Sequence, residues 1–169
     1  TLSLLPVLRQ KGYTHLALEA LSNDGKDPLS RGYPDRDSGM YTREPVFAAL
    51  IREAKRLGYR LVPYETASAP GERQQDRETG QADAIAKVLA GDPQARMLVH
   101  AGYAHIGEAQ QGLPDDARPM AMELARISGL PLLTVDQAST RSYEADDAHT
   151  VGRKLSLAFA ASVPSVLVA

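Results

Sequence analysis

Short aliphatic segments alternate with segments of helical periodicity along most of this chain, and no other feature constrains its fold as strongly. Four aliphatic runs have the length of β-strands: residues 14–21, 59–65, 95–102 and 131–137. Three segments between them repeat apolar side chains at helical spacing: residues 44–58, 77–93 and 119–130. Strands that alternate with helices of about 10–15 residues form a parallel sheet with helices on its faces. The sequence therefore predicts an α/β fold of three layers, with a mainly parallel sheet and helices on both faces.

Proline and glycine mark the ends of these segments. Pro45 fits the first turn of a helix, and Gly58 fits the position just after the last residue of that helix. Gly91 and Gly129 end the next two helices in the same way. Pro63 has no N–H to donate to a neighbouring strand, so we expect the strand that contains it to lie at a sheet edge or to end irregularly.

The two ends of the chain resemble the interior of a longer protein. Residues 1–12 are typical of the end of a helix, and residues 164–169 of a strand. Residues 139–152 are polar and loop-like, while residues 154–169 fit a strand, a helix or one of each. We expect one α/β domain over residues 1–169 that is a fragment of a longer chain. It lacks the first strand of the fold, and whether C-terminal elements are missing as well stays open.

Composition excludes several classes of partner. The chain has 19 Lys and Arg against 21 Asp and Glu, a formal net charge of −2, and no basic run of the kind that binds nucleic acid. No apolar run approaches the roughly 18 residues of a membrane span. Cysteine is absent, which excludes thiolate nucleophiles and cysteine-based zinc sites. We therefore expect a small-molecule ligand or substrate; the compartment, cytoplasmic or periplasmic, and the oligomeric state stay open.

Polar side chains stand where each predicted strand ends. Glu19, Glu65, His100 and Asp136 each follow a run of aliphatic residues and precede a loop. In an open parallel sheet, ligands bind beyond the carboxyl ends of the strands. Adjacent parallel strands would therefore bring these four side chains to one rim. Each acid alone is explained as well by a cap or a loop hydrogen bond, and each histidine by a structural role, so the functional interpretation depends on their convergence.

Carboxylates and imidazoles in a cleft can act as general acid and base, or can bind zinc, manganese or iron. The segment HAGYAH, residues 100–105, does not have the spacing of the zinc motif HExxH. The sequence has no GxSxG elbow, no P-loop and no GxGxxG after a strand. Nucleotide-dependent chemistry is therefore not indicated, whereas acid–base and metal chemistry both stay open.

Five short motifs in the first three-fifths of the chain carry a resemblance to a known family. In order, they are HLALEAL, GMY, F-x-x-L-I-x-x-A-x-x-L-G-Y, RE-x-x-x-A-x-x-I and LVHAGYAHIGE. This arrangement resembles the erythromycin esterase-like, ChaN-like and TraB-like superfamily over residues 4–107. The resemblance implies a parallel α/β sheet, in agreement with the alternation of strands and helices, and a bacterial origin.

The resemblance also implies an active cleft and assigns three residues to it. The family has a Glu after its second strand, an Arg that leads a helix, and a His after a later strand. Glu19 resembles the first of these, Arg77 the second and His105 the third, with His100 as a nearby alternative to His105. The family's first strand, with its Glu-x-x-His motif, has no counterpart in this sequence. Either it belongs to a longer chain, in which case a general base or metal ligand is missing here, or this protein never had it.

Members of this superfamily differ in activity, so three functions follow as expectations. The first is a hydrolase-like enzyme in which His105 and Glu19 polarise a water and Arg77 stabilises developing negative charge. A metal-assisted form would use Glu19, His100 or His105 as ligands of a divalent metal.

The second expectation is a protein of the ChaN-like type that binds haem or another flat ligand. The third is a structural interaction domain whose rim is vestigial. The aromatic content of 5%, with no Trp, gives a haem pocket few stacking surfaces. The candidate ligand-binding residues, which fall near the rim, are Tyr41, Glu65, His100 and Tyr103.

Overall fold

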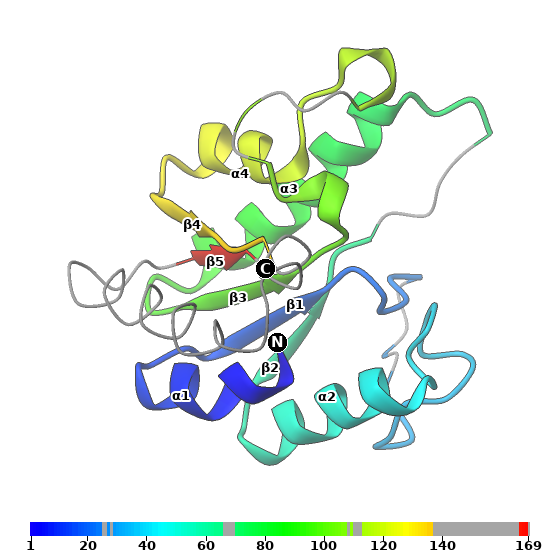
Figure 1. Ribbon diagram of the computed structural model, residues 1–169, viewed down its shortest axis with the longest axis vertical. Helices are drawn as coiled ribbons and strands as arrows, with labels where there is room; N and C mark the ends of the chain where they lie inside the picture. Colours follow the sequence, from blue (N-terminus) through cyan, green and yellow to red (C-terminus); the bar gives the residue numbers. More distant parts are fainter. Residues whose placement is uncertain are drawn as a thin grey trace, which may run out of the picture.

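The computed structural model contains a single parallel β-sheet. It describes residues 1–24, 27, 29–65, 70–107, 109, 113–136 and 166–168. Five strands are present in these residues: β1 His15–Leu18, β2 Arg60–Pro63, β3 Met97–His100, β4 Leu132–Thr134 and β5 Val166–Val168. They are ordered β2-β1-β3-β5-β4, and every neighbouring pair is parallel (Figure 1). The α/β fold with a parallel sheet is therefore as the sequence predicts.

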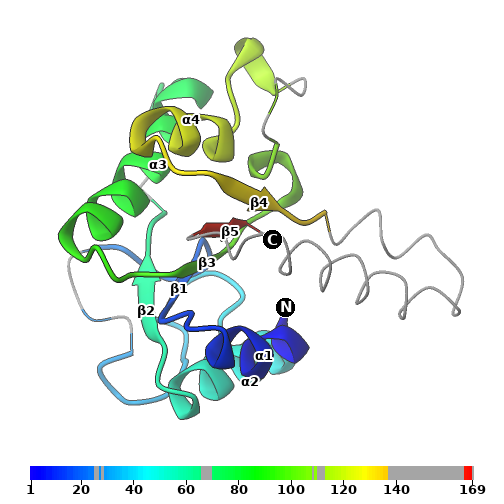
Figure 2. The same ribbon diagram turned by 90° about the vertical axis from the view of Figure 1, so that its left-hand side faces the viewer.

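Helices lie on both sides of this sheet. Among the described residues the α-helices are α1 Leu5–Gln10, α2 Pro45–Arg56, α3 Gln74–Gly91 and α4 Met120–Ser128. Three short 3-10 helices accompany them: η1 Leu2–Leu4, η2 Tyr103–His105 and η3 Pro114–Asp116. Two views at right angles place α1 and α2 together on one side of the strands and α3 and α4 together on the other (Figures 1 and 2).

The apolar side chains of successive strand residues point alternately to these two sides, which creates two cores. On β3, Leu98 packs in the cluster that contains the buried residues of α1 and α2. Its neighbours Met97 and Val99 pack in the cluster formed with α3 and α4. Both clusters contain fully buried aliphatic side chains, so burial of apolar area stabilises the sheet from each side.

Helix ends fall close to the predicted positions. Glu44 caps α2, and its carboxylate accepts hydrogen bonds from the first free N–H groups of the helix. Gly129 ends α4 in the left-handed conformation, with φ 66°, as the sequence predicts. Helix α3 begins at Gln74, before the predicted start at Arg77, so Arg77 lies in its first turn instead of leading it.

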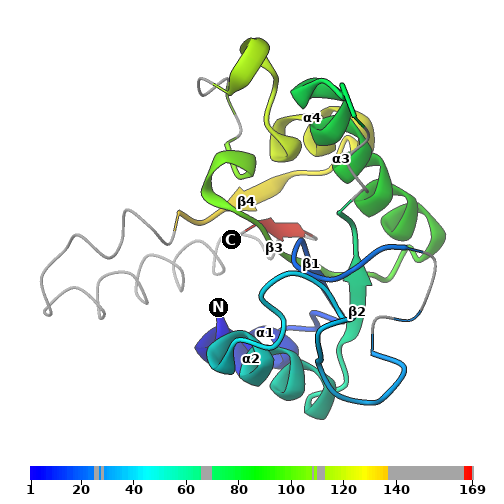
Figure 3. The ribbon, with the colours of Figure 1, turned by 90° about the vertical axis from the view of Figure 1, so that its right-hand side faces the viewer.

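Strands are shorter than their aliphatic runs. The run over residues 14–21 becomes β1 over only His15–Leu18. Strand β2 is an edge strand, paired only with β1 among the described residues, which confirms the expectation for Pro63. Figure 3 shows β2 at the side of the sheet, with β5 farther in.

The C-terminal strand pairs in a way that the sequence left open. Strand β5 inserts between β3 and β4, although β4 precedes it in the chain. The predictions for residues 139–152 and for most of residues 154–169 lie outside the described part of the chain. Within the described residues, no helix is long and apolar enough to span a membrane.

Candidate active site

Three of the four predicted rim residues meet at the carboxyl ends of neighbouring strands. Glu19 follows β1 directly, Glu65 follows β2, and His100 is the last residue of β3. Strand β1 lies between β2 and β3, so these three strand ends are adjacent. Asp136 follows β4, which β5 separates from β3, so its strand end is not adjacent to the other three.

A guanidinium group joins the two carboxylates. Arg77, from the first turn of α3, donates from Nη2 to Oε1 of Glu19 at 3.0 Å and from Nε to Oε1 of Glu65 at 3.2 Å. Its Nη2 also donates to Oε2 of Glu65. Gln81, one helical turn after Arg77, donates to the same Glu65 oxygen at 3.0 Å. The predicted Glu19 and Arg77 therefore form one ion-paired cluster, which also contains Glu65.

His105 reaches this cluster from η2. Its Nε2 lies 3.4 Å from Oε1 of Glu19 and 3.3 Å from Nη1 of Arg77. Its Nδ1 lies 2.8 Å from Oε2 of Glu78, a residue that the sequence analysis did not select. The three residues carried over from the superfamily thus contact one another, although they come from three different elements of the fold.

The charge on His105 follows from its carboxylate neighbours. Burial lowers the pKa of His105, but the hydrogen bond and charge of Glu78 and the charge of Glu19 outweigh burial, while Arg77 opposes them. The net effect is a pKa raised above the ordinary value of 6.5. The protonated imidazole can donate from Nδ1 to Glu78 and from Nε2 towards Glu19, whereas the neutral imidazole with its proton on Nδ1 accepts at Nε2 from Nη1 of Arg77.

Glu78 is a fully buried carboxylate, and both of its oxygens have hydrogen-bond partners. Its Oε2 accepts from the backbone N–H of Met120, at the start of α4, at 2.7 Å, in addition to the contact with His105. Its Oε1 accepts from Gln74 at 2.5 Å. Glu78 lies on the helix face that carries the apolar stripe of α3, at the helical spacing that precedes Ala82 and Ile85. A carboxylate on such a face is the signal in the sequence that could have identified it.

The glycine of the HAGYAH segment brings the backbone up to Glu19. The N–H of Gly102 donates to Oε2 of Glu19 at 2.6 Å. A Cβ atom at Gly102 would lie 3.4 Å from both that oxygen and Cδ2 of His105. Together, Gly102 and Arg77 hold the two oxygens of the Glu19 carboxylate in fixed positions.

A cavity of about 330 Å³ opens over this cluster. The described residues that line it are Glu19, Ala20, Met40, Tyr41, Phe47, Glu65, Arg77, His100, Ala101 and Gly102. The side chains of Glu19, Glu65 and Arg77 keep 22%, 25% and 26% of their surface exposed, so they are accessible from the cavity. That of His105 keeps 8%, which places it behind Glu19.

The predicted ligand-binding residues differ in their relation to this cavity. Tyr41 and His100 line it together with Glu65, whereas Tyr103 is not among the lining residues and keeps 59% of its surface exposed. The edge of the His100 ring packs on Phe47, with centroids 5.5 Å apart and planes at 87°. Burial lowers the pKa of His100, so it presents a neutral imidazole at neutral pH.

A closely packed loop carries Met40 and Tyr41 to the cavity. Gly39 has φ 134°, and a Cβ atom there would lie 2.0 Å from the carbonyl oxygen of Ala20. Only glycine therefore permits this loop to pack on the segment that follows β1. Tyr41 adopts the left-handed conformation, with φ 61°, which a tyrosine rarely occupies.

The donor set does not fit a metal ion. No group of three His, Asp or Glu side chains within the described ranges is arranged to hold a cation. The Arg77 guanidinium occupies the position between the Glu19 and Glu65 carboxylates and supplies the positive charge there.

Comparison of the chain with protein-family models, with curated proteins and with solved structures gave no match. The resemblance to the erythromycin esterase-like, ChaN-like and TraB-like superfamily stays a prediction. The contacts among Glu19, Arg77, His105 and Glu78 are properties of this structure and do not depend on it.

Proposed function

We propose that this protein is an enzyme of three-layer α/β architecture that hydrolyses a small-molecule substrate at the cluster of Glu19, Arg77 and His105. One observation carries the proposal: a carboxylate, a guanidinium and an imidazole from three separate elements contact one another beside a cavity of about 330 Å³. Membership of the superfamily that residues 4–107 resemble is part of the same proposal.

In this mechanism Glu19 is the general base. Its carboxylate is exposed to the cavity, and its two oxygens are held by Arg77 and by the N–H of Gly102. A carboxylate offers about four acceptor positions, so it can still accept a proton from a water bound in the cavity. The water oxygen attacks the substrate carbonyl, its proton passes to Glu19, and that proton then goes to the leaving group.

Arg77 and His105 support this step from opposite sides of Glu19. The Arg77 guanidinium lies on the cavity wall and stabilises the negative charge that develops on the substrate oxygen. His105 lies behind Glu19, so it acts through that carboxylate as a positioning residue. The carboxylates of Glu78 and Glu19 raise the pKa of His105, so they favour a positive charge next to Glu19.

A non-enzymatic protein that binds haem or another flat ligand is the alternative. The apolar part of the cavity wall favours it, because Met40 and Phe47 lie there beside the neutral imidazole of His100. Titration with haem separates the two functions. A Soret shift in wild type that is lost in His100→Ala supports the ligand-binding alternative. The absence of a Soret shift in wild type rules out haem binding.

Replacement of Glu19 by glutamine is expected to reduce hydrolysis by about 10²–10⁴-fold, because glutamine keeps the shape of the side chain but cannot accept the proton. The measurement is kcat/KM of the purified protein on a series of para-nitrophenyl esters that differ in acyl chain. Glu53→Gln is the matched control, since Glu53 pairs with Arg56 on α2, away from the residues that line the cavity. Equal activity of Glu19→Gln and wild type on every hydrolysed ester would overturn the proposal.

A further inference from the structure

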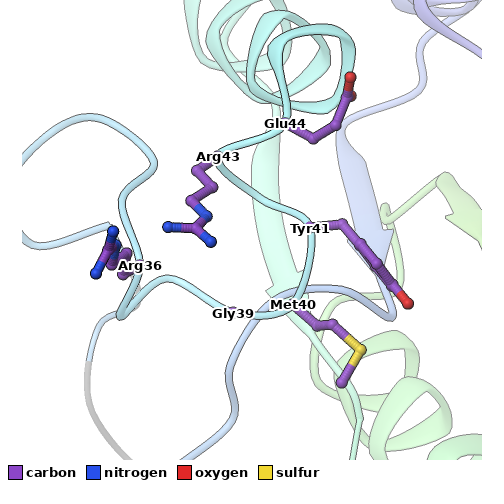
Figure 4. Close-up of a pocket in the computed structure, with 6 residues that line it drawn as sticks. All are labelled: Arg36, Gly39, Met40, Tyr41, Arg43 and Glu44. Carbon is purple, nitrogen blue, oxygen red and sulfur yellow. The ribbon is translucent and has the colours of Figure 1, made fainter.

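A second hollow, of about 740 Å³, lies next to the cavity over Glu19. The described residues that line it are Arg36, Gly39, Met40, Tyr41, Arg43 and Glu44 (Figure 4). Met40 and Tyr41 line both this hollow and the cavity, so the two spaces share a wall. We refer to the hollow lined by these six residues as the arginine hollow.

Two positive charges in the arginine hollow, those of Arg36 and Arg43, have no carboxylate partner among the described residues. Figure 4 shows the side chains of Arg36 and Arg43 on one side of the loop and those of Met40 and Tyr41 on the other. Within the part of the chain that the structure describes, no ion pair or hydrogen bond engages either guanidinium. The remaining charged residue of the hollow is Glu44, whose Oε2 accepts from the backbone N–H groups that begin α2 at 3.0 and 3.1 Å.

Asp35, an acid of the same loop, has partners other than these two arginines. Its Oδ1 accepts from the N–H groups of Asp37 and Ser38, and its Oδ2 lies 3.6 Å from Nε of Arg31. In a chain whose net charge is −2, two guanidinium groups in one hollow with no ion pair to a described residue are a local excess of positive charge.

Buried contacts hold the backbone that carries these arginines. Thr42 is fully buried and donates from Oγ1 to the carbonyls of Asp35 and Gly39, at 3.1 and 2.9 Å. The carbonyl of Ser38, which is also fully buried, accepts from the N–H of Ser22 at 2.8 Å. A loop that is fixed before binding loses little conformational entropy when a ligand arrives.

We propose that Arg36 and Arg43 form a subsite for an oxyanion, a carboxylate or a phosphate, at the end of the substrate remote from the reacting bond. The inference rests on the proposed hydrolysis and names its substrate class: esters of small molecules that also carry an anionic group. Arginine suits this role because its planar donors match the geometry of both anions. Met40 and Tyr41 line both spaces, so a substrate that extends over these two side chains from Glu19 would place its far end in the arginine hollow.

Two esters with acyl chains of equal length test this inference. The anionic ester is mono-para-nitrophenyl glutarate and the neutral one is para-nitrophenyl pentanoate. We expect Arg36→Gln/Arg43→Gln to lower kcat/KM on the anionic ester about tenfold, through KM, and to leave the neutral ester unchanged, since charge-assisted hydrogen bonds contribute to binding remote from the reacting bond. Arg52→Gln/Arg60→Gln, which removes two other exposed arginines, is the matched control.

Binding of free glutarate and of inorganic phosphate, measured by calorimetric titration, provides a readout that does not require catalysis. Weaker glutarate binding in the arginine variant identifies a carboxylate subsite, and weaker phosphate binding a phosphate subsite. Loss of binding without hydrolysis of either ester supports the subsite and overturns the proposed hydrolysis. Hydrolysis of both esters with no effect of the arginine variant on binding or KM overturns the subsite and leaves the proposed hydrolysis standing.

Discussion

Exchange of Glu78 for glutamine is expected to lower the pKa of His105 from above its ordinary value of 6.5 to below it. Burial favours the neutral imidazole, and in the wild-type protein the Glu78 carboxylate, 2.8 Å from Nδ1, and the charge of Glu19 outweigh it. Glutamine keeps the shape of the side chain and can still accept the Nδ1–H group, but it removes the negative charge. Burial and the positive charge of Arg77 then dominate.

An NMR titration of the histidine ring protons measures this change. The chain has four histidines, and the His105 signal is identified by its absence from the spectrum of His105→Gln. Glu53→Gln serves as the control, because its carboxylate lies on the surface of α2, paired with Arg56. An unchanged His105 pKa in Glu78→Gln would show that Glu78 does not hold the imidazolium.

The ion pair of His105 and Glu78 makes the free energy of unfolding depend on pH in a defined direction. The pKa of His105 is higher in the folded than in the unfolded protein. The stabilisation that protonated His105 provides is therefore complete below about pH 6.5 and is lost as the pH rises through the pKa of the folded protein. Glu78→Ala removes one partner of a buried pair and is expected to lower the free energy of unfolding by about 3–5 kcal/mol. Urea unfolding at several pH values measures both effects, and a variant as stable as wild type at pH 6 would contradict them.

Arg77→Lys is expected to lower kcat by about 10²–10³-fold, with a smaller change in KM. The guanidinium donates to Glu19 and to both oxygens of Glu65 at the same time. Lysine keeps the positive charge but concentrates it on one nitrogen, so it cannot hold both carboxylates and also face the substrate oxygen.

Arg73→Lys is the matched control for this substitution. Arg73 precedes the first residue of α3, pairs with Asp76 and has a side chain that is 73% exposed. We expect its kcat to equal that of wild type. A kcat for Arg77→Lys that also equals wild type would mean that Arg77 only joins β1 to β2 and does not stabilise the reaction.

Much of this arrangement is predictable from the sequence for simple physical reasons. Glu19, Glu65 and His100 are identifiable because aliphatic runs end at them and parallel strands bring their carboxyl ends to one edge. Arg77 and His105 carry no such signal. They were selected only through the resemblance, and their contacts with Glu19 depend on the packing of α3 and η2.

Two features could not be predicted because they depend on residues that are distant in the chain. Glu78 contacts His105 across 27 positions, and only the fold shows that the buried carboxylate has an imidazole partner. The sheet order is the second case. Strand β5 lies between β3 and β4, so the end of β4, which Asp136 follows, is not adjacent to the end of β3. No local pattern in the sequence specifies which strands are neighbours.

The central claim is that Glu19 and His105 act as one catalytic unit, and a double-mutant cycle tests it most directly. The measurement is kcat/KM of wild type, Glu19→Gln, His105→Gln and the double variant on the ester that wild type hydrolyses fastest. Because His105 acts through the Glu19 carboxylate, 3.4 Å away, the double variant should be no slower than Glu19→Gln, within about threefold. Losses that multiply in the double variant would contradict the claim, because they would mean that the two residues act independently.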